Sequence, residues 1–356
     1  MTEIALNLCS QKKPIPTDDQ LGFGVHFTDH MLVMDYDLKK GWHDMRIEPY
    51  GPISIDPSMM VLHYGQAVFE GMKAFRAADG NINIFRPRDH FQRFNNSAVR
   101  VCIPELDIEE LLDGLKKLLE IDHQWVPSTH GTALYIRPFI FATDQFLGVR
   151  PSHTYKLMII LSPVGAYYAE GFNPVKIMVE DKYVRAVRGG IGAIKTPGNY
   201  AASLLAAVEA KEKGFTQVLW LDAHELKWLE EVGTMNIMLK LGDEVITPPL
   251  TGSILPGITR DSTLKLLKQW QIPAAEKQIS IDEVMAAGRG GKLVEMFGTG
   301  TAAVISPVGS IHYRDESVVI NNGAVGELSQ RLFDAITAIQ YGDKEDSFGW
   351  IETVKL

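Results

Sequence analysis

The sequence predicts a mixed α/β (α+β) fold divided into two domains. Runs rich in β-branched and aromatic residues, typical of strands, alternate along the chain with stretches whose leucines recur at helical spacing. The chain has 356 residues, more than a single hydrophobic core usually accommodates. A segment dense in Gly and Pro, "SPVGAYYAEGFNP", interrupts the pattern. We therefore expect a small N-terminal α/β domain over 1–161, an interdomain loop over 162–174 and a large C-terminal domain over 175–356.

The first half of the chain is typical of strands with a few helices. Strand-like patterns cover 31–36, 61–75 and 81–85, the last of them after the turn "ADG". A helix is expected to begin near Arg88, and the leucines of "DIEELLDGLKKLLEID" at 107–122 predict another. Two buried strands, "GTALYIRPFIFA" and "TYKLMIILSPV", follow these helices.

The second half mixes strands and helices. Strands are predicted at "VKIMVE" and "TQVLWLD", on either side of an alanine-rich helix at 200–214 that Gly214 closes. The segment "NIMLKLGDEVITPP" predicts a hairpin, and "ITRDSTLKLLKQW" and "IDEVMAAG" predict helices. Near the end, "GKLVEMFGTGTAAVISPV" is typical of a strand, a glycine turn and another strand.

The composition favours small-molecule ligands. Hydrophobic residues make up 46% of the chain and charged residues 22%, as in an ordinary globular protein. The 35 basic and 44 acidic residues give a formal charge of −9, which argues against nucleic acid or an anionic membrane as partner. The only two cysteines, Cys9 and Cys102, are too few for a disulfide framework and suit a reducing compartment. We expect a cytoplasmic protein without a membrane span.

Several motif matches fail on closer inspection. The stretch "RGGIGAIKTPGNY" contains Lys195 but lacks the glycine that a phosphate-binding P-loop requires at position 194, which is Ile194. The match "GTGTAA" at 298–303 precedes a strand rather than the helix of a dinucleotide-binding fold, although its amides could still hold an anion. The segment "HELKW" places Trp228 where a zinc-binding helix needs its second histidine. No metal site is expected.

Lys195 is the candidate for covalent chemistry. It lies in a glycine-rich turn before a helix of small side chains, where a sheltered neutral amine could form Schiff bases with carbonyls. One of the acids of "EEVGTMN", Glu230 or Glu231, could keep a heteroaromatic nitrogen protonated. The segment "ILPGITRDS" places Gly257 just before a predicted helix, whose first amides could bind a phosphate. The segments "FRPRDHFQR" and "YVRAVR" supply arginines, which could also bind a phosphate. Together these features describe a pyridoxal 5′-phosphate site.

At this point the sequence resembles the branched-chain amino acid aminotransferases, a family of fold type IV pyridoxal phosphate enzymes. The resemblance covers nearly the entire chain. It is carried, in the family's order, by "FTDHM", "YGQAVFEGMKAFR", "FRPRDHFQRF", "LYIRPF", "VGAYY", "VRGGIGAIKTPGNYAAS", "EEVGTMNIM", "ILPGITR" and "MFGTGTAAVISPV". The two-domain fold type IV architecture is what the resemblance implies.

The resemblance also implies the residues that bind the cofactor. Lys195 is expected to form the Schiff base and to move the proton of the substrate α-carbon, and Glu231, rather than Glu230, to pair with the pyridine nitrogen. Tyr200 is expected to hydrogen-bond the phenolic oxygen of the ring. The phosphate is expected at Arg86, Arg185, the amides of Ile258 and Thr259, and Thr301.

The substrate residues follow from the same resemblance. An apolar pocket is implied at Phe23, Tyr64, Phe69, Tyr135, Tyr167, Thr234 and Met235. Amides at Thr301 and Ala302 are expected to bind the α-carboxylate, and Arg137 the side-chain carboxylate of glutamate. The chain is expected to form a homodimer in which Leu147 and Val149 reach the active site of the partner subunit.

The function implied is transfer of the amino group of L-leucine, L-isoleucine or L-valine to 2-oxoglutarate. A D-amino acid aminotransferase or an aminodeoxychorismate lyase is the alternative within the fold, since both would share the lysine, glutamate and phosphate elements. A catalytically silent homologue that binds a ligand or a partner is the alternative from another class. The redox-sensitive Cys-x-x-Cys of mammalian relatives is replaced here by Ala303 and Ser306, so no thiol switch is expected at these positions.

Overall fold

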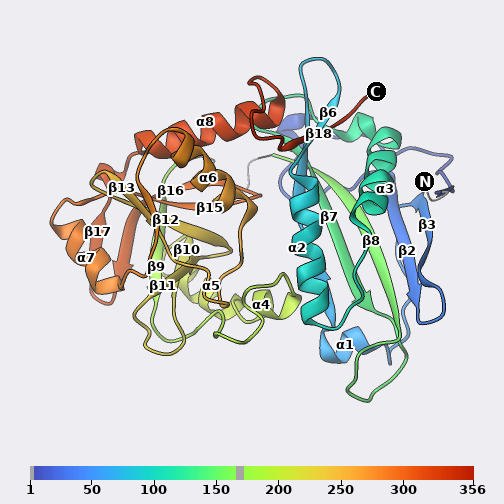
Figure 1. Cartoon of the computed structure of the whole chain (residues 1–356), viewed down its shortest axis with the longest axis horizontal. Coiled ribbons are helices and arrows are strands. Elements are labelled where there is room, and N and C mark those ends of the chain that lie inside the picture. Colours follow the sequence, from blue (N-terminus) through green and yellow to red (C-terminus); the bar gives the residue numbers. More distant parts are fainter. Residues whose placement is uncertain (1–3, 166–171) are drawn as a thin grey trace. The chain divides into compact units, whose positions relative to one another are not determined.

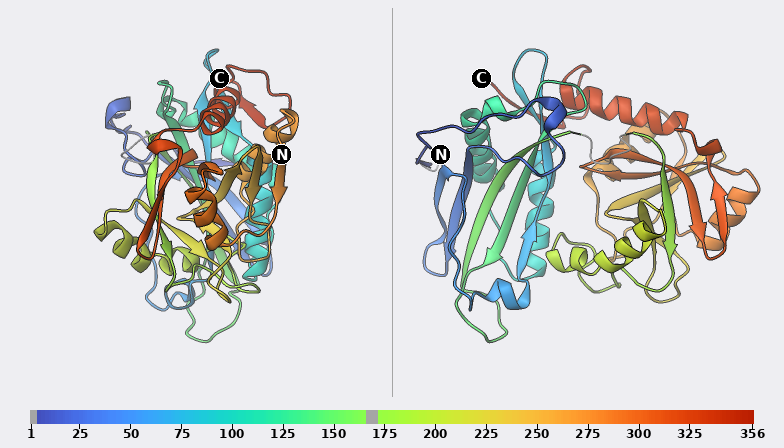
Figure 2. Two further views of the ribbon diagram at one scale, coloured as in Figure 1. Left: turned by 90° about the vertical axis from the view of Figure 1, so that its left-hand side faces the viewer. Right: turned by 180° about the vertical axis from the view of Figure 1, so that it is seen from behind.

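The computed structural model describes residues 4–165 and 172–356. Its residues group into two compact units (Figures 1 and 2). The first unit comprises Met1–Tyr167, Ile194–Pro197 and Ala338–Leu356, and the second comprises Tyr168–Ala193 and Gly198–Thr337. The expected interdomain loop includes 166–171, which lie outside the described residues, so its bounds stay a prediction. The alternation of helices and strands confirms the predicted α/β class.

Among the described residues, the first unit is built around one sheet with three complete α-helices. Its helices are α1 (Met60–Tyr64), α2 (Pro87–Arg100) and α3 (Ile108–Ile121). Its strands are β1 (Ala5–Leu6), β2 (His30–Asp37), β3 (Gly41–Pro49), β4 (Ala67–Phe69), β5 (Met72–Arg76), β6 (Ile82–Phe85), β7 (Ala133–Ala142), β8 (Thr154–Val164) and β18 (Ile351–Val354). Short 3₁₀ turns lie at Asp18–Gln20 and His123–Trp125.

The nine strands of the first sheet are ordered β1-β3-β2-β8-β7-β5-β6-β18, with β4 paired to β7. Helices α2 and α3 lie against one face of this sheet (Figure 1). The leucines of α3 recur at helical spacing and are buried there, and Asp107 caps the helix by accepting from the Glu110 N–H at 2.9 Å. Alternate residues of β7 point to this core, so Tyr135 and Arg137 fall on the opposite face.

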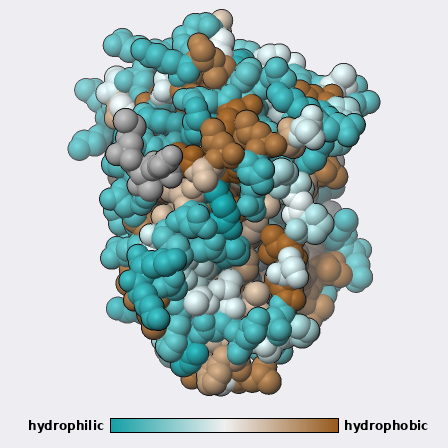
Figure 3. All heavy atoms as spheres, turned by 90° about the vertical axis from the view of Figure 1, so that its right-hand side faces the viewer, coloured by the Kyte–Doolittle hydropathy of each residue, from teal (hydrophilic) through white to brown (hydrophobic). Residues whose placement is uncertain are grey.

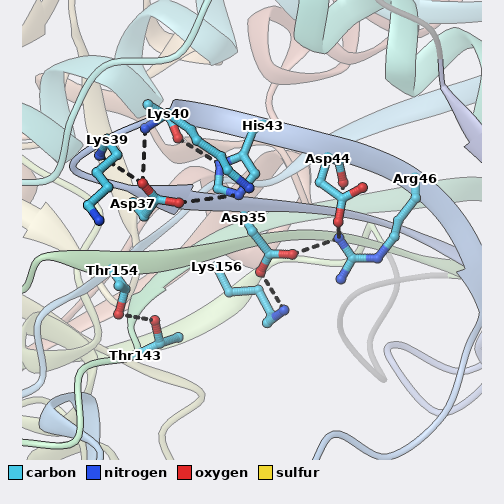
Figure 4. A network of polar contacts seen from close by, with 11 residues as sticks. Asp35, Asp37, Lys39, Lys40, His43, Asp44, Arg46, Thr143, Thr154 and Lys156 are labelled. Atoms are coloured by element: carbon cyan, nitrogen blue, oxygen red, sulfur yellow. Dashed lines mark hydrogen bonds and ion pairs between the residues drawn. The ribbon is translucent and has the colours of Figure 1, made fainter.

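On strands β2, β3 and β8, that opposite face of the sheet carries charged side chains. Asp35 of β2 accepts from Lys156 of β8 at 2.6 Å and from Arg46 of β3 at 2.7 Å (Figure 4). Burial would raise the pKa of Asp35, but the hydrogen bonds and the positive charges of Lys156 and Arg46 together outweigh burial and hold the pKa below its ordinary value. On the side of the molecule where β2 and β3 lie in Figure 1, the surface shows separate groups of apolar side chains among hydrophilic ones (Figure 3).

The second unit contains the second sheet and most of the remaining helices. Its helices are α4 (Pro197–Ala201), α5 (Leu204–Glu212), α6 (Ile258–Gln269), α7 (Ile281–Arg289) and the greater part of α8 (Glu327–Tyr341). Its strands are β9 (Val175–Glu180), β10 (Gln217–Leu221), β11 (Leu229–Val232), β12 (Met235–Leu241), β13 (Glu244–Thr247), β14 (Ala274–Glu276), β15 (Leu293–Gly300), β16 (Val304–Tyr313) and β17 (Glu316–Val319). A 3₁₀ turn lies at Asn321–Gly323.

The strands of the second sheet are ordered β11-β10-β9-β16-β15-β12-β13-β14, with β17 paired to β16. An additional pairing of β11 with β12 closes a ring of strands through β10, β9, β16 and β15. Alternate residues of β9 and β10 enter two different cores: Met178 and Trp220 pack against α5, whereas Ile177 shares a core with α7. Helix α7 begins with a capping box between Ser280 and Glu283.

Two predicted elements differ in the structure. Part of the strand predicted at 61–75 is helix α1, which ends where Gly65 adopts a left-handed φ of 62°. The single helix predicted at 200–214 is divided into α4 and α5. Between them the Ser203 hydroxyl donates to the Tyr200 carbonyl at 2.8 Å, a local bond that competes with the helical hydrogen bonds. Within 4–165 and 172–356, no helix combines the length and the apolar character that crossing a bilayer requires.

Candidate active site

The backbone on both sides of Lys195 is bound tightly to the first unit. The Lys195 N–H donates to the Ser97 hydroxyl at 3.1 Å, and the Lys195 carbonyl accepts from the Phe69 N–H at 3.0 Å. The Thr196 hydroxyl donates to the Ala67 carbonyl at 2.8 Å. These bonds join residues about a hundred positions apart in the sequence, and they fix the half-buried lysine against β4 and α2.

The Phe69 ring is the centre of an aromatic cluster that contains Lys195. The Lys195 Nζ lies 4.9 Å from the centroid of this ring, and the Arg137 guanidinium lies 4.9 Å from it. Arg137 also lies 5.1 Å from the Tyr135 ring and donates to the Tyr135 hydroxyl at 2.9 Å. Phe23 packs edge-on against Tyr135 at 5.1 Å. The structure thus brings together five of the predicted site residues.

Arg137 retains a hydrogen-bond donor for a ligand. Its Nε is buried and has no hydrogen-bond partner among the described residues, which also include no acidic partner for its guanidinium. Arg137 is half-buried, and a buried Nε without an acceptor is costly unless a ligand supplies one. Gly71 leaves room for Tyr135, because a Cβ at Gly71 would lie 2.0 Å from the Tyr135 hydroxyl oxygen.

A buried ionic cluster supports this site, and sequence reasoning missed it. Glu70, fully buried, accepts from Arg93 Nε at 2.9 Å and from Arg93 Nη2 at 2.6 Å, and faces His90 Nδ1 at 3.2 Å. Burial alone would raise the pKa of Glu70, but the charge of Arg93 and contact with His90 hold it far below its ordinary value. His90, Arg93 and Ser97 follow one another on one face of α2, a polar pattern on a buried face that could have signalled the cluster.

A buried lysine, Lys73, lies in the same unit as the half-buried Lys195. Lys73 of β5 is 8% exposed and pairs in register with Tyr135 of β7. Burial lowers its pKa to about 8. Lys73 is therefore a competitor of Lys195 for carbonyl chemistry that the sequence patterns did not single out.

Arg86 stands at the N-terminus of α2 in an unusual conformation. Its φ is 51°, in the left-handed region, and its N–H donates to the Trp350 carbonyl at 2.6 Å. Its Nε donates to Asp89 at 2.6 Å, and its guanidinium lies 5.4 Å from the Trp350 ring centroid. The side chain is 5% exposed, so it is held in one place beside the first turn of α2.

In the second unit, Glu231 and Arg185 form a buried pair. Glu231, on β11, accepts from the Leu255 N–H at 2.7 Å and faces Arg185 Nε at 3.2 Å. Arg185 also donates to the Gly192 carbonyl at 3.1 Å and to the Ser253 carbonyl. The expected phosphate role of Arg185 stays a prediction, because the contacts given for this arginine are with Glu231 and two carbonyls.

Glu230 and Glu231 have separate environments, because successive residues of a strand point to opposite sides. The Glu230 Oε1 accepts from the Ser253 hydroxyl, and its Oε2 has no hydrogen-bond partner among the described residues. Burial raises the pKa of Glu230 above its ordinary value. Sequence patterns alone did not decide between Glu230 and Glu231, but the structure gives the two carboxyl groups different partners.

The two elements that the sequence predicts to bind anions lie in the second unit. The predicted helix after "ILPG" is α6, which begins at Ile258, so the amides of Ile258 and Thr259 lie in its first turn. Gly257 precedes them, and a Cβ there would lie 1.9 Å from the Asn236 amide oxygen. The predicted strand-turn-strand is β15 and β16, with Thr301 and Ala302 in the turn. A Cβ at Gly298 would lie 2.6 Å from Met235, so this glycine admits the methionine.

The remaining predicted residues are placed as follows. Tyr200 lies half-buried in α4, and Thr234 is exposed in the turn between β11 and β12. The Tyr64 hydroxyl donates to the Leu147 carbonyl. Tyr167 lies outside the described residues. In the described part of the chain, no three His, Cys, Asp or Glu residues are grouped so as to hold a metal ion.

Comparisons with known proteins identify the family. The family model described as amino-transferase class IV matches residues 67–311. The chain is 57% identical over 351 residues to branched-chain-amino-acid aminotransferase 2 of Bacillus subtilis (strain 168), a match that covers 99% of this chain and 97% of the relative.

Solved structures agree with the sequence matches. The crystal structure of the Escherichia coli branched-chain amino acid aminotransferase gives a TM-score of 0.78 at 29% identity, covering 92% of this chain and 99% of that chain. The T.th. branched-chain amino acid aminotransferase, complexed with N-(5′-phosphopyridoxyl)-L-glutamate, gives a TM-score of 0.73 at 25% identity, covering 91% and 98%. Because the family model spans more than half of the chain and the similarity runs almost end to end, the chain belongs to the branched-chain-amino-acid aminotransferases of the class IV aminotransferase family.

Proposed function

We propose that this protein transfers the amino group of L-leucine, L-isoleucine or L-valine to 2-oxoglutarate, with pyridoxal 5′-phosphate held on Lys195. The observation that carries the proposal is the Phe69 ring, which the Lys195 amine and the Arg137 guanidinium both approach to 4.9 Å. A nucleophilic amine and a carboxylate-binding group are thus fixed beside one apolar surface. The apolar surface suits the side chain of a branched-chain amino acid, and the carboxylate-binding group suits the acidic side chain of glutamate.

The cofactor supplies an aldehyde that condenses with amines and a ring that accepts electrons from the bond broken at the substrate α-carbon. Lys195 would hold it and move the α-proton. Glu231 would keep the ring nitrogen protonated, and its contacts with Arg185 and the Leu255 N–H give this buried carboxylate the partners that it needs. Tyr200 would bind the phenolic oxygen. The first-turn amides of α6 suit the phosphate, with Thr301, Arg86 and Arg185 as further proposed contacts.

The same residues account for two kinds of substrate. Phe23, Phe69 and Tyr135 would bury the isobutyl or isopropyl group of a branched-chain amino acid. When glutamate or 2-oxoglutarate binds, Arg137 would receive its second carboxylate through the Nε that has no partner among the described residues. We propose that the other predicted pocket residues, Tyr64, Tyr167, Thr234 and Met235, complete the apolar surface, and that amides at Thr301 and Ala302 bind the α-carboxylate.

We further propose that the protein acts as a homodimer and in the cytoplasm. Leu147 and Val149 are 63% and 84% exposed, as is expected of apolar residues that a partner subunit covers. Both cysteines are free thiols, which suits a reducing compartment.

Reduction of the purified protein with borohydride, followed by peptide mapping, tests the lysine assignment. We expect a pyridoxyl label on the peptide that contains Lys195, and loss of that label in Lys195→Ala. Lys73→Met serves as the matched control, because Lys73 is a buried lysine whose pKa burial lowers to about 8. A label on Lys73, or a label that survives Lys195→Ala, would contradict the assignment.

Substrate assays separate the alternatives within the fold. We expect transamination of L-leucine with 2-oxoglutarate, and little turnover of D-alanine or aminodeoxychorismate. Activity on D-alanine or aminodeoxychorismate alone would assign the protein to the alternative class. Absence of visible cofactor absorbance after addition of pyridoxal 5′-phosphate would support the silent homologue.

A further inference from the structure

Three consecutive polar residues, Thr28, Asp29 and His30, are buried but have no role in the proposed reaction. They lie at and just before the first residue of β2, and their exposed fractions are 0%, 4% and 2%. Burying polar side chains is costly unless hydrogen bonds satisfy them, so their partners show what these residues hold in place. Phe23, which packs edge-on against Tyr135, lies a few residues before Thr28 in the sequence.

The Asp29 carboxylate joins two segments that are far apart in the sequence. Its Oδ1 accepts from the Lys13 N–H at 2.8 Å, and its Oδ2 accepts from the Trp125 Nε1 at 3.0 Å. Trp125 is 4% exposed and belongs to the main core of the first unit. Asp29 therefore ties the Lys13 backbone to that core.

Lys13 is bound a second time, through its side chain. Its Nζ donates to the Thr28 carbonyl at 2.8 Å and lies 4.4 Å from the centroid of the Tyr50 ring. Together with the backbone bond of Lys13, these contacts close a loop over 14–27, which we call the Phe23 loop. Its length and its joined ends are those of a compact Ω-loop.

His30 holds the chain before Lys13 separately. Its Nε2 accepts from the Cys9 N–H at 3.0 Å, and its Nδ1 contacts the Asp122 carboxylate at 2.6 Å. Asp122 is 2% exposed and directly follows α3. A change in the Lys13 side chain should therefore act on the Phe23 loop and leave the preceding segment in place.

Within the Phe23 loop, two glycines flank Phe23 itself. Gly22 and Gly24 have φ values of 58° and 71°, in the left-handed region that glycine adopts without Cβ strain. The Gly22 carbonyl accepts from the Gly165 N–H at 2.9 Å. The Phe23 ring then meets the Tyr135 ring edge-on, with the two centroids 5.1 Å apart. The turn thus places Phe23 against a residue of the proposed substrate pocket.

The rest of the Phe23 loop buries little surface. Most of its residues are exposed, and its further anchors are Leu21, which is 1% exposed, and Asp18, which accepts from the Thr129 N–H at 3.0 Å. A segment with so few buried contacts opens locally at a low free-energy cost. The bonds at its two ends therefore contribute a large share of what keeps the loop closed.

We propose that Lys13 and Asp29 are positioning residues for substrate binding, because they hold the Phe23 loop closed and keep Phe23 over the side-chain pocket. The inference rests on the proposed function and adds to it two residues outside the pocket. A closed loop keeps water from the apolar substrate side chain, which raises affinity in proportion to the apolar area buried. Loop opening should therefore weaken the binding of L-leucine without changing the chemistry at its α-carbon.

Lys13→Met tests the proposal, because this exposed position should tolerate the change. The full chain loaded with pyridoxal 5′-phosphate reacts with L-leucine in a single turnover, which is followed by cofactor absorbance. We expect the half-saturating concentration of L-leucine to rise by about fivefold and the limiting rate to stay within about twofold. Lys13→Arg keeps a cationic donor and should return the half-saturating concentration to within about twofold of the native value. Lys12→Met, at the exposed neighbouring position, is the matched control and should behave as the native chain.

Asp29→Asn tests the same connection from its other side. An amide accepts only through its oxygen, so one of the two N–H groups that Asp29 binds loses its acceptor. We expect the same separation of binding from rate as in Lys13→Met. The rise in half-saturating concentration should be smaller for L-2-aminobutyrate, because its shorter side chain buries less apolar surface.

Hydrogen exchange measures the Phe23 loop without any turnover. 4-Methylpentanoate has the side chain and the carboxylate of leucine but no amine, so it cannot condense with the cofactor. At saturation it should slow exchange of the amides of the Phe23 loop by about tenfold in the native chain and in Lys12→Met. The slowing should be weaker in Lys13→Met.

The inference is wrong if Lys13→Met and Asp29→Asn keep the native half-saturating concentration, or if they lower the limiting rate as much as the affinity. It is equally wrong if Lys13→Arg behaves like Lys13→Met, or if 4-methylpentanoate leaves exchange of the Phe23 loop unchanged in the native chain. A native chain that does not react with L-leucine would refute the proposed function, and this inference with it.

Discussion

Ser97 shows how a single hydroxyl can fix the backbone of a lysine far away in the sequence. Its oxygen accepts from the Lys195 N–H at 3.1 Å, and its proton goes to the Arg93 carbonyl at 2.9 Å. Ser97 is 1% exposed, so water does not replace it readily. The lysine backbone therefore depends on α2 for one of its hydrogen bonds.

Replacing Ser97 by Ala should impair the reaction more than it impairs folding of the rest of the chain. The variant removes the Ser97 acceptor of the part-buried Lys195 N–H, which costs up to about 1–3 kcal/mol and loosens the backbone that positions the amine. We expect a fall in kcat for L-leucine of about tenfold, with a changed pH midpoint of the visible cofactor absorption. Asn96→Ala, an exposed position of the same helix, is the control. An unchanged kcat and spectrum would contradict this positioning role.

Arg137→Gln should separate the two halves of the transamination. The variant removes the guanidinium that we propose for the second carboxylate of glutamate, but leaves the aromatic residues around it. We expect KM for 2-oxoglutarate to rise by about tenfold or more, because one charged hydrogen bond contributes about 1.5–3 kcal/mol. Single-turnover reaction with L-leucine, followed by cofactor absorbance, should change much less. Equal losses in both half-reactions would refute the assignment.

At the scale of elements, α2 is held to β4 and β5 by charges as well as by apolar packing. Glu70 and Arg93 are both buried and bonded through two hydrogen bonds. Removing one member leaves the other as an uncompensated buried charge. We therefore expect Glu70→Gln to lower the free energy of unfolding by about 3–5 kcal/mol.

The pH dependence of this effect has a clear sign. The folded-state pKa of Glu70 is depressed, so its contribution to stability is complete above the unfolded value of about 4.3 and is lost as the pH falls towards the folded value. The free energies of unfolding of the native chain and of Glu70→Gln, measured with denaturant, should therefore converge progressively below about pH 4. A difference that is constant from neutral to acid pH would contradict the depressed pKa.

A half-exposed network on the same sheet should behave differently. Asp35 interacts with Lys156 and Arg46, but its side chain is 30% exposed (Figure 4). Solvent screens such pairs, so Asp35→Asn should cost about 1 kcal/mol or less. The same denaturant titration measures both variants. A loss for Asp35→Asn as large as that for Glu70→Gln would mean that burial does not set the strength of these ion pairs.

The elements that the sequence predicted well are those with local signals. The leucine spacing and Asp107 specify α3, and Gly257 before an apolar-periodic segment specifies α6. The division between α4 and α5 was missed because it depends on a Ser203 hydroxyl bond within one turn. The Glu70 cluster was missed because it joins the segment between β4 and β5 to α2 through buried charges, which no periodicity of apolar residues reveals.

At the scale of the whole molecule, the order of segments in the sequence does not predict which segments belong to the same unit. Residues 338–356 return to the first unit, where β18 pairs with β6 through Ile351 and Phe85. Lys195 likewise belongs with the first unit although it follows β9 in the sequence. The motif of Lys195 predicts a role that stays a proposal, but its attachment to Ser97 and Phe69 could not be predicted, because these contacts are set by tertiary packing and not by local spacing.

The loop between β7 and β8 is the place where we expect a second copy of the chain to bind. Phe146, Leu147 and Val149 are 44%, 63% and 84% exposed on this loop. Hydrogen bonds nevertheless hold the two ends of this loop together, because Asp144 accepts from the His153 N–H at 2.9 Å and from the Thr154 hydroxyl at 2.7 Å. Apolar side chains presented by an ordered loop favour an interface with a partner.

Val149→Asp should therefore shift the proposed homodimer towards the monomer and reduce transamination of L-leucine in parallel. A charge buried at an interface without a partner costs several kcal/mol, so the dissociation constant should rise by at least about tenfold. Val319→Asp is the control, since Val319 is 64% exposed on β17 in the other unit. Sedimentation velocity over a dilution series measures the association of both variants, and activity at the same concentrations shows whether the loop completes the site. A native chain that stays monomeric, or a Val149→Asp variant that dimerises as the native chain does, would exclude this loop as the interface.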